Sequence, residues 1–229
     1  MTTVVVQVAM DEEAQPFIDL AAETSEPLAV ARAVHRGVVA DGHTFVLVTS
    51  GVGMVNAADA AVGALHRYGD DVLLVSAGSA GGLGADVRVG EVFVGTEHVN
   101  VEADARAFGY VAGQVPGMPA SYAPDAPAFA ALTSSAVEGV PVREGAIGSG
   151  EKFVTVGIAH GLREEFPRLQ VVDMETAAIA QVAFNHGVRF VSVRGISDLC
   201  APDGEEFLTH VDDAAERSAR VVVAALGRL

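Results

Sequence analysis

Short runs of β-branched and other apolar residues alternate with alanine-rich segments along this chain. Unbroken apolar runs of this kind suit strands that are buried on both faces, as in a sheet covered by helices. The alternation predicts a single α/β domain over residues 1–229, with a mixed, mostly parallel, twisted central sheet flanked by helices. The strand-like runs are Val4–Val8, Thr44–Ser50, Val72–Ala77, Glu91–Val94, Gln170–Val172 and Phe190–Val193.

Segments between these runs have the spacing of helices. Asp125 precedes one of them as an acidic cap before a proline in the first turn, and Gly187 ends another. The stretch Asn100–Pro127 is rich in proline and glycine instead, and long ordered loops of this kind usually have a functional or interface role. The expected helices are Met54–Tyr68, Pro127–Val137, Glu175–His186 and Glu205–Leu226.

Acidic residues dominate the charge of the chain. Its 229 residues include 30 Asp and Glu against 14 Lys and Arg, which gives a formal net charge of −16. Half of the residues are hydrophobic, so the chain is not intrinsically disordered, because disorder requires low hydrophobicity together with high charge. An acidic surface repels nucleic-acid phosphates and anionic lipid headgroups. We therefore expect neither nucleic acid nor a membrane among its partners.

The cysteine and histidine content argues against disulfides and metals. Cys200 is the single cysteine, which excludes an intrachain disulfide and favours a reducing compartment. No basic residue precedes the first apolar run, and no apolar run approaches the roughly 20 residues of a membrane span. We therefore expect a soluble, cytoplasmic protein. The 7 histidines form no H-E-x-x-H or Cys/His cluster, so no metal is expected.

Three glycine clusters follow predicted strands, at 50–53, 78–84 and 148–150. In α/β sheets, ligands bind beyond the carboxyl ends of the strands, where turns need glycine and backbone N–H groups face the ligand. None of the clusters completes G-x-G-x-x-G or G-x-x-x-x-G-K-[ST], so dinucleotide and P-loop sites are disfavoured and no cofactor is expected.

Acidic residues also stand at the ends of predicted strands. Glu13 follows the first strand, Glu175 follows Gln170–Val172, and Asp198 follows Phe190–Val193. An acid in such a place either serves the first turn of a helix or belongs to a site, and Asp198 has no obvious helix directly behind it. Three acids that converge on one sheet edge are therefore candidates for catalysis.

Seven segments, weak singly but specific in this order and spacing, resemble the nucleoside phosphorylase/hydrolase superfamily. Within it, the chain is similar to the 5′-methylthioadenosine/S-adenosylhomocysteine nucleosidases over nearly its whole length. The resemblance implies one active site per subunit that hydrolyses the N-glycosidic bond of a small nucleoside, giving adenine and the 5′-thioribose. The segments are Ala9–Glu13, Ser50–Gly53, Gly78–Gly82, Ala107–Tyr110 with Gly113–Gly117, Ser149–Val154, Val172–Glu175 and Ser197–Asp198.

The resemblance also implies catalytic roles for four residues. Asp198 would be the general acid at purine N7, and Glu13 would activate water. Glu175 would bind the ribose hydroxyls, and Ser79 would lie near the ribose and the departing base. These roles suit the chemistry, because breaking a ribosyl C–N bond builds positive charge on the sugar and requires protonation of the base.

Further residues are implied to bind the substrate. Phe153 would stack on adenine, and the Phe153 and Val154 backbone would read the edge of the base. Val52 and Phe207 would line the pocket for the 5′-alkylthio group, while Met174 and Ser197 flank Glu175 and Asp198. Phe108 and Pro116 would cover that pocket from a neighbouring subunit, which predicts a homodimer.

Hydrolysis is favoured over phosphorolysis by the first loop, where Asp11, Glu12 and Glu13 would repel phosphate and suit neutral water. The chain departs from the family pattern at Val101–Asp104, where Tyr-His-Asp-Ala-Asp is more usual, at Asp173, where Glu is more usual, and in the short segment after Asp198. The departures concern the 5′ substituent. The alternatives are a futalosine or aminodeoxyfutalosine hydrolase, a purine nucleoside phosphorylase and a non-catalytic nucleoside-binding module.

Overall fold

The computed structural model describes residues 2–201 and 204–229. Strands and helices alternate through most of this length, as the sequence predicts. The strands are β1 (Thr3–Val8), β2 (Glu23–Thr24), β3 (Leu28–Val30), β4 (Ala33–Ala40), β5 (His43–Thr49), β6 (Val72–Gly82), β7 (Val92–Asn100), β8 (Val142–Ser149), β9 (Leu169–Asp173) and β10 (Arg189–Asp198). The helices are α1 (Asp11–Asp19), α2 (Met54–Tyr68), α3 (Ala126–Thr133), α4 (Val156–Glu165), α5 (Thr176–His186) and α6 (Glu205–Ala225), with short 3₁₀ turns η1 (Arg106–Phe108) and η2 (Leu226–Arg228).

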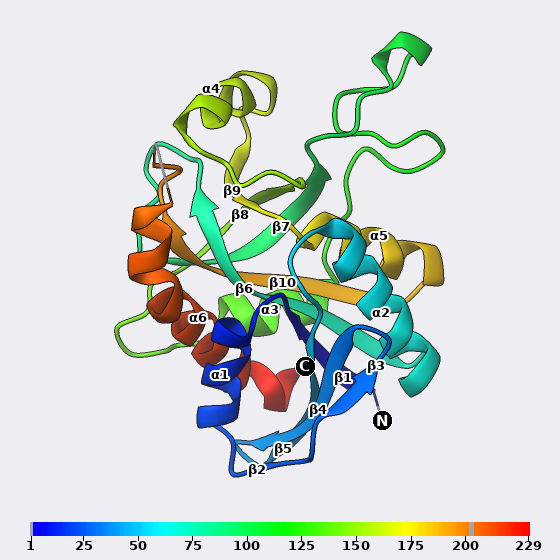
Figure 1. The fold of residues 1–229 in the computed structure, drawn as a ribbon, viewed down its shortest axis with the longest axis vertical. Helices are drawn as coiled ribbons and strands as arrows, with labels where there is room; N and C mark the ends of the chain where they lie inside the picture. Colours follow the sequence, from blue (N-terminus) through cyan, green and yellow to red (C-terminus); the bar gives the residue numbers. More distant parts are fainter. Residues whose placement is uncertain (1, 202–203) are drawn as a thin grey trace.

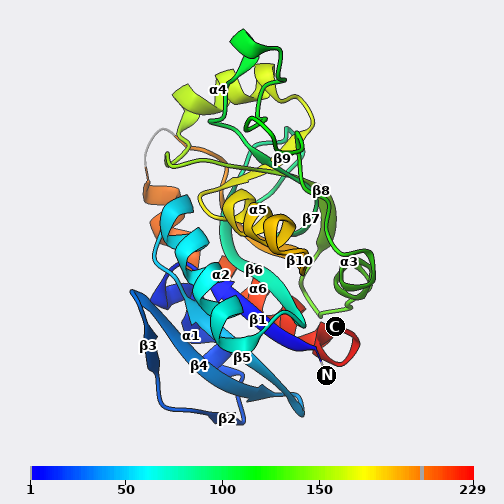
Figure 2. The same cartoon turned by 90° about the vertical axis from the view of Figure 1, so that its right-hand side faces the viewer.

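One mixed sheet connects all the strands. Strand β1 lies at its centre and pairs in parallel with β5 and β6, and β6 pairs in parallel with β10. The strand order is β10-β7-β8-β9-β6-β1-β5-β4-β2, with an additional β10–β6 pairing. That pairing closes β6, β10, β7, β8 and β9 into a ring, while β1, β5 and β4 extend from it as an open sheet (Figures 1 and 2). The expected α/β fold with a mixed central sheet is confirmed.

The interior of the ring is filled by one apolar side chain from each of its strands. Ala80, Phe93, Ile147, Val171 and Ile196 form this cluster together with one residue from the β6–β7 connection. The inward positions must be small or closely matched, because a five-stranded ring leaves little space. The ring therefore brings the carboxyl ends of β6, β9 and β10 close together.

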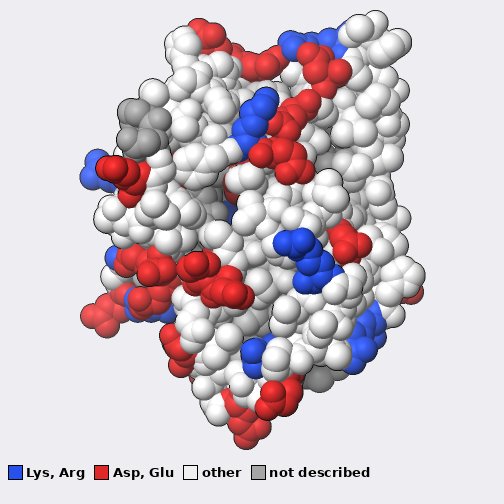
Figure 3. All heavy atoms as spheres, viewed as in Figure 1, with Lys and Arg blue, Asp and Glu red and all other residues white. Residues whose placement is uncertain are grey.

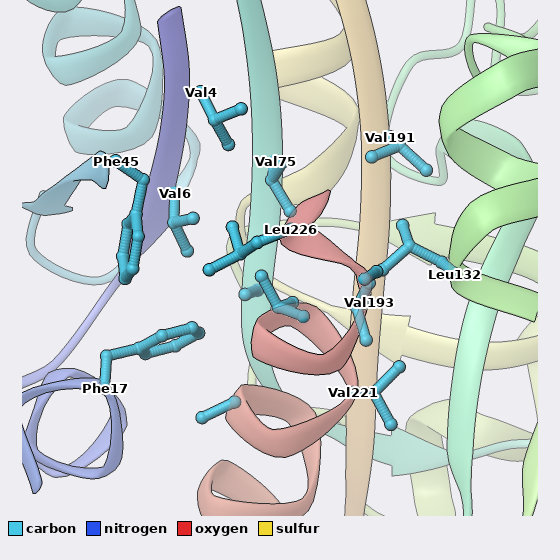
Figure 4. Close-up of a cluster of buried hydrophobic side chains, with 14 of the residues drawn as sticks. Val4, Val6, Phe17, Phe45, Val75, Leu132, Val191, Val193, Val221 and Leu226 are labelled. Atoms are coloured by element: carbon cyan, nitrogen blue, oxygen red, sulfur yellow. The ribbon is translucent and has the colours of Figure 1, made fainter. Parts of the chain in front are cut away.

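Helices cover both faces of the sheet. Helices α1, α3 and α6 pack on one face, where apolar side chains of β1, β6 and β10 meet α6 in the largest hydrophobic cluster (Figure 4). Helices α2 and α5 cover the other face through their alanines (Figure 1). Strands buried on both sides explain the unbroken valine and leucine runs.

In residues 2–201 and 204–229, no helix is both long enough and apolar enough to span a bilayer.

The predicted helix Met54–Tyr68 is confirmed with the same ends. Asp125 is the N-cap of α3 and accepts a hydrogen bond from Ala128 N at 3.0 Å, but α3 ends at Thr133 rather than Val137. The end of α5 at Gly187, which has a left-handed backbone, is also as expected. The elements without a counterpart among the predicted ones are strands β2, β3, β4 and β8 and helices α1 and α4.

Two predicted strands are longer than the sequence indicates. Strand β6 continues through the glycines to Gly82, and β10 continues to Asp198, which is its last residue. The sequence analysis places the glycine cluster 78–84 after the predicted strand Val72–Ala77, whereas Gly78–Gly82 belong to β6 itself. They remain extended because β10 pairs with Gly78–Gly81 and β9 pairs with Gly81 and Gly82. The small residues fit here because neighbouring side chains crowd the strand: a Cβ atom on Gly82 would lie 2.7 Å from Val87.

The segment from 101 to 125 is a long connection between β7 and α3, as predicted for Asn100–Pro127. Its one helical element is the short turn η1. Tyr122, near its end, forms an isolated antiparallel bridge with His98 of β7. Figure 1 shows this green segment extending away from the body of the molecule, with a short helical turn at its far end. Phe108, in that turn, is 83% exposed.

Candidate active site

A cavity of about 250 Å³ opens where the carboxyl ends of β1, β6, β9 and β10 meet. Its position follows from the sheet topology, because the ring brings the ends of β6, β9 and β10 together and β1 pairs in parallel with β6. Ten of the residues predicted for the site line this cavity: Glu13, Val52, Ser79, Phe153, Val154, Met174, Glu175, Ser197, Asp198 and Phe207. Phe108 and Pro116, both of which the structure describes, do not line the cavity of their own chain.

Glu13 lies in the first turn of α1 with its side chain turned back toward the sheet, and the residue is 2% exposed. Its Oε1 accepts hydrogen bonds from Ser79 N at 2.7 Å and Ser79 Oγ at 2.8 Å. Its Oε2 accepts hydrogen bonds from Ala9 N at 2.8 Å and Met10 N at 3.3 Å. These four donors hold the carboxylate in one orientation at the cavity wall.

Glu175 immediately precedes α5 and is also buried. Its Oε1 accepts a hydrogen bond from Gly53 N at 2.9 Å, and its Oε2 lies 3.6 Å from Arg194 Nη1. Burial raises the pKa of Glu175 to about 7; Arg194 opposes this effect, while the charges of Asp173 and Glu13 add to it. The group therefore changes its charge near neutral pH.

Arg194 is the cation of the site that sequence reasoning missed. It lies in the middle of β10 with its side chain 1% exposed, and its Nε is 2.8 Å from Asp173 Oδ2. The guanidinium also donates hydrogen bonds to Ser76 Oγ at 2.7 Å and Thr176 Oγ1 at 2.8 Å. The sequence did contain a signal for this role, since Arg194 stands within an apolar strand-like run. A guanidinium buried in a strand requires acidic partners, so its position indicates a buried ion pair.

Asp173 holds the other side of this arginine. It also accepts hydrogen bonds from the hydroxyl groups of Ser149 and Thr176. The short aspartate is therefore fully engaged within the protein, and Arg194 lies between it and Glu175. The cavity wall thus contains three carboxylates, from Glu13, Asp173 and Glu175, near one buried guanidinium.

Asp198 lies across the cavity at the end of β10 and is 4% exposed. Its Oδ2 accepts a hydrogen bond from Ser197 Oγ, and its Oδ1 accepts one from Cys200 N, both at 2.9 Å. Burial raises the pKa of the Asp198 carboxyl; the hydrogen bonds from Cys200 N and Ser197 Oγ oppose this effect, and the negative charge of Glu206 adds to it. Cys200 is buried, as expected, and burial raises the pKa of its thiol to about 12, so this cysteine is not a reactive group at neutral pH.

The N-terminus of α2 is occupied by carboxylates from distant parts of the chain. Gly53 N donates to Glu175, and Met54 N donates to Glu151 Oε1 at 3.1 Å. A helix N-terminus next to a glycine loop is an anion site, and here the anions belong to the protein itself. Glu102 in turn accepts a hydrogen bond from Glu151 N at 3.1 Å and lies 3.4 Å from Lys152 Nζ. Sequence reasoning assigned no role to Glu151, because its contacts lie about a hundred residues away.

Apolar side chains form the open end of the cavity. Phe153 and Phe207 meet edge to face with their ring centroids 5.6 Å apart. Val52 lies at the same cavity and is 43% exposed, and Phe153 is 39% exposed. These partly exposed apolar surfaces suit the flat face of a base and an alkylthio group.

Charge is distributed unevenly between the surface and the site. Acidic side chains occur in several groups over the face shown in Figure 3, with basic side chains between them. Among the described residues that line the cavity, Lys152 is the one basic side chain, and it pairs with Glu102. The cavity is therefore acidic and apolar, which suits a neutral ligand that gains positive charge.

Comparison with known proteins places this geometry in a family. The model of the phosphorylase superfamily matches residues 3–227. The 5′-methylthioadenosine/S-adenosylhomocysteine nucleosidase of Anoxybacillus flavithermus is 37% identical over 93% of both chains. The crystal structure of the Neisseria meningitidis nucleosidase of the same name, in complex with methylthio-immucillin-A, has a TM-score of 0.93 at 34% identity over 100% of both chains.

A third relative is the corresponding nucleosidase of Colwellia psychrerythraea in complex with adenine, with a TM-score of 0.92 and 30% identity over 100% of this chain and 96% of the other. The chain belongs to the phosphorylase superfamily and, within it, to the family of 5′-methylthioadenosine/S-adenosylhomocysteine nucleosidases. The resemblance stated from the sequence is thereby confirmed. The futalosine hydrolase of Helicobacter pylori, at 23% identity and a TM-score of 0.91, shares the fold.

Proposed function

We propose that the protein hydrolyses the N-glycosidic bond of 5′-methylthioadenosine and S-adenosylhomocysteine, releasing adenine and the 5′-thioribose. The observation that carries this proposal is the placement of three buried carboxylates, Glu13, Glu175 and Asp198, around one largely apolar cavity. Binding alone does not require three buried acids, and burying a carboxyl group costs free energy that hydrogen bonds and charge pairing must offset.

Asp198 is the general acid of this proposal. The leaving adenine is a poor anion, so a proton must reach N7 as the C–N bond breaks. A carboxyl group can carry that proton near neutral pH only if its pKa is raised, and burial raises the pKa of Asp198. Ser197 Oγ and Cys200 N hold the two carboxyl oxygens, which keeps the group directed at the cavity.

Glu13 activates the attacking water. Its four hydrogen bonds fix the carboxylate beside Ser79, which lines the same cavity near the expected ribose position. A fixed base acts without reorientation during the reaction, and general bases typically contribute about 10²–10⁴-fold. The bond to C1 forms from the water oxygen while the electrons of the C–N bond leave with the protonated base.

Glu175 binds the ribose hydroxyls and stabilises the positive sugar. The transition state has oxocarbenium character, which nearby carboxylates favour. Arg194 keeps Glu175 in place from behind without lining the cavity. Phe153 and the Val154 backbone hold the base, Met174 lies under the ribose, and Val52 and Phe207 contact the 5′-thio group.

Water is the proposed nucleophile rather than phosphate. The base of the cavity contains carboxylates; one of them, Glu175, caps the N-terminus of α2 together with one further carboxylate, Glu151. A phosphate anion in this place would be repelled by Glu13 and Glu175. Lys152, the one basic side chain among the described lining residues, is paired with Glu102.

The active unit is proposed to be a homodimer. Phe108 is 83% exposed on the segment from 101 to 125, and Pro116 on the same segment is also exposed. An exposed phenylalanine on a loop that extends away from the molecule suits contact with another protein surface. In this arrangement Phe108 and Pro116 reach the 5′ pocket of the neighbouring subunit, next to Val52 and Phe207.

The experiment that tests the function is adenine release. Purified protein is incubated with 5′-methylthioadenosine, S-adenosylhomocysteine or futalosine, with and without phosphate, and the released base is measured. We expect adenine from the first two substrates at a rate independent of phosphate. Formation of 5-methylthioribose 1-phosphate from 5′-methylthioadenosine would indicate a phosphorylase. A preference for futalosine would indicate the other hydrolase, and ligand recovered unchanged would indicate a binding module.

The Asp198→Asn variant tests the acid. It keeps the shape of the side chain but removes the proton donor, so turnover should fall about 10²–10⁴-fold while the fold is retained. The matched control is Asp212→Asn, which removes an exposed carboxylate of α6. A fully active Asp198→Asn protein would refute the role of the acid.

A further inference from the structure

Asp198, the proposed acid, stands at the end of β10, directly before the connection to α6. Cys200 adopts a left-handed backbone with φ of +56°, which directs its N–H back to Asp198 Oδ1. The thiol of Cys200 donates to Gly82 O at 3.5 Å and fills the space beside β6. The backbone of Asp198 is held by the pairing of β10 with β6, whereas its carboxyl group is also held by the residues that directly follow the strand.

One side chain from α6 reaches back to that turn. Glu206 Oε2 accepts a hydrogen bond from Leu199 N at 2.9 Å, directly between Asp198 and Cys200. Glu206 is also the charged side chain whose negative charge raises the pKa of Asp198. The next residue, Phe207, lines the cavity and meets Phe153. The first turn of α6 thus contacts both the 5′ end of the cavity and the backbone that carries the acid.

We propose that Glu206 is a positioning residue for Asp198, whose contact with Leu199 N holds the turn so that the acid faces the leaving base. The inference rests on the proposed nucleosidase function. Glu206 does not line the cavity, so it acts on the reaction through Asp198 and not on the substrate. Because Phe207 follows it in the same helical turn, a 5′ group seated against Phe207 also stabilises the position of Glu206.

Two effects of Glu206 act in the same direction. Its hydrogen bond fixes the Leu199 peptide, which limits the conformations available to the neighbouring Asp198 and Cys200. Its negative charge favours the protonated form of Asp198, which is the form that a general acid needs. A Gln side chain keeps an acceptor oxygen for Leu199 N but has no charge, and an Ala side chain has neither.

The test compares two leaving groups on the same sugar. Adenine needs protonation to leave, whereas 4-nitrophenolate leaves without a proton. We would measure Glu206→Ala, Glu206→Gln and the control Asp212→Asn with 5′-methylthioadenosine and with the 4-nitrophenyl β-glycoside of 5-methylthioribose. Water attacks C1 in both cases, and the bond from C1 to nitrogen or to oxygen breaks.

Glu206→Ala should slow adenine release by about 10–100-fold, a part of the contribution of a general acid, while nitrophenolate release changes less than about threefold. The rate of adenine release by Glu206→Gln should lie between the rates of Glu206→Ala and the unmodified protein. The rate of Asp212→Asn should equal that of the unmodified protein. An equal fall with both substrates, or no change with either, would overturn the proposal. If the unmodified protein hydrolyses neither substrate, the proposed function itself fails and this inference fails with it.

Discussion

Glu13 is in contact with the backbone at Gly78: a Cβ atom at position 78 would lie 2.4 Å from Glu13 Oε1. Gly78 has φ of +141°, a conformation that side chains with a Cβ rarely adopt. Glycine therefore suits position 78 for two reasons: the positive φ of the backbone, and the space that the Glu13 carboxylate occupies beside it. No other residue type leaves room for Glu13 to accept both hydrogen bonds from Ser79.

Gly78→Ala should displace the Glu13 carboxylate and reduce kcat on the order of 10²-fold, since small misplacements of catalytic groups have effects of this size. Steady-state kinetics with 5′-methylthioadenosine measures the effect. The control is Gly139→Ala, which has φ of +74° but nothing near its Cβ position, so it adds backbone strain alone. If both variants keep full kcat, the contact at Gly78 has no catalytic consequence.

Replacement of Arg194 should destabilise the protein strongly. Arg194→Met leaves Asp173 and Glu175 buried without their cation, and removal of one member of a buried charge group costs about 3–5 kcal/mol. Urea unfolding measures the free energy of unfolding. The matched control is Arg168→Met, which removes an exposed pair with Glu97 and should cost about 0–1 kcal/mol. Equal losses in the two variants would contradict the structural role of Arg194.

The activity should depend on the ionisation of Glu175. Burial raises the pKa of this group to about 7, and the ionised form is needed for the ribose hydroxyls and the positive sugar. We expect kcat/KM, which reports groups of the free enzyme, to fall about tenfold per pH unit below pH 7. Glu175→Gln imitates the protonated carboxyl, so this variant should have low activity. Its kcat/KM should no longer fall below pH 7, that is, the acidic limb of the pH profile should be absent. Retention of the limb in Glu175→Gln would assign it to another group.

His98 should make the protein sensitive to acid. It is fully buried, with Nδ1 donating to Tyr122 O at 2.8 Å and Nε2 accepting from Ser192 Oγ at 2.7 Å. Burial lowers the pKa of His98 from 6.5 to about 4. The unfolded chain therefore binds a proton more readily between these values, so stability is full above pH 6.5 and declines as the pH falls, by about 2 kcal/mol at pH 5.

Urea unfolding at pH 7 and pH 5 checks this expectation. His98→Asn should lose stability at both values, but its further loss between pH 7 and pH 5 should be about 2 kcal/mol smaller than in the unmodified protein. His66→Asn, at an exposed position of α2, serves as the control. If His98→Asn and the unmodified protein have the same pH dependence, another group is responsible.

The three acids proposed for catalysis could be predicted to lie at the site because each follows an apolar run. Glu13, Glu175 and Asp198 each follow a segment whose β-branched residues identify it as a buried strand, and strand ends in an α/β sheet meet at one edge. The α2 helix was predictable for the same reason, since its periodic alanines are a local property. Local patterns therefore identified the acids at the cavity, whereas the other predicted lining residues came from the family resemblance.

The strand extent in β6 and β10 could not be predicted in the same way. Gly78–Gly82 have low strand propensity, and only the pairings with β10 and β9 keep them extended. Likewise, the proline- and glycine-rich stretch Asn100–Pro127 indicates a long ordered loop. The contact of its residues Phe108 and Pro116 with a second subunit stays a prediction. Tertiary contacts override local propensity where partners come from distant segments.

The sequence by itself determined the α/β class through its periodicity and the acids at the strand ends through the apolar runs before them. It indicated the family through the order and spacing of seven motif segments that resemble it. The tertiary structure alone decided which groups hold those acids. Arg194 meets Asp173 and Glu175 only because the ring brings β9 and β10 beside β6, and Glu206 meets Leu199 only because α6 folds back along β10. Hydrogen bonds and charges act over a few ångströms, and only the folded chain brings such residues that close.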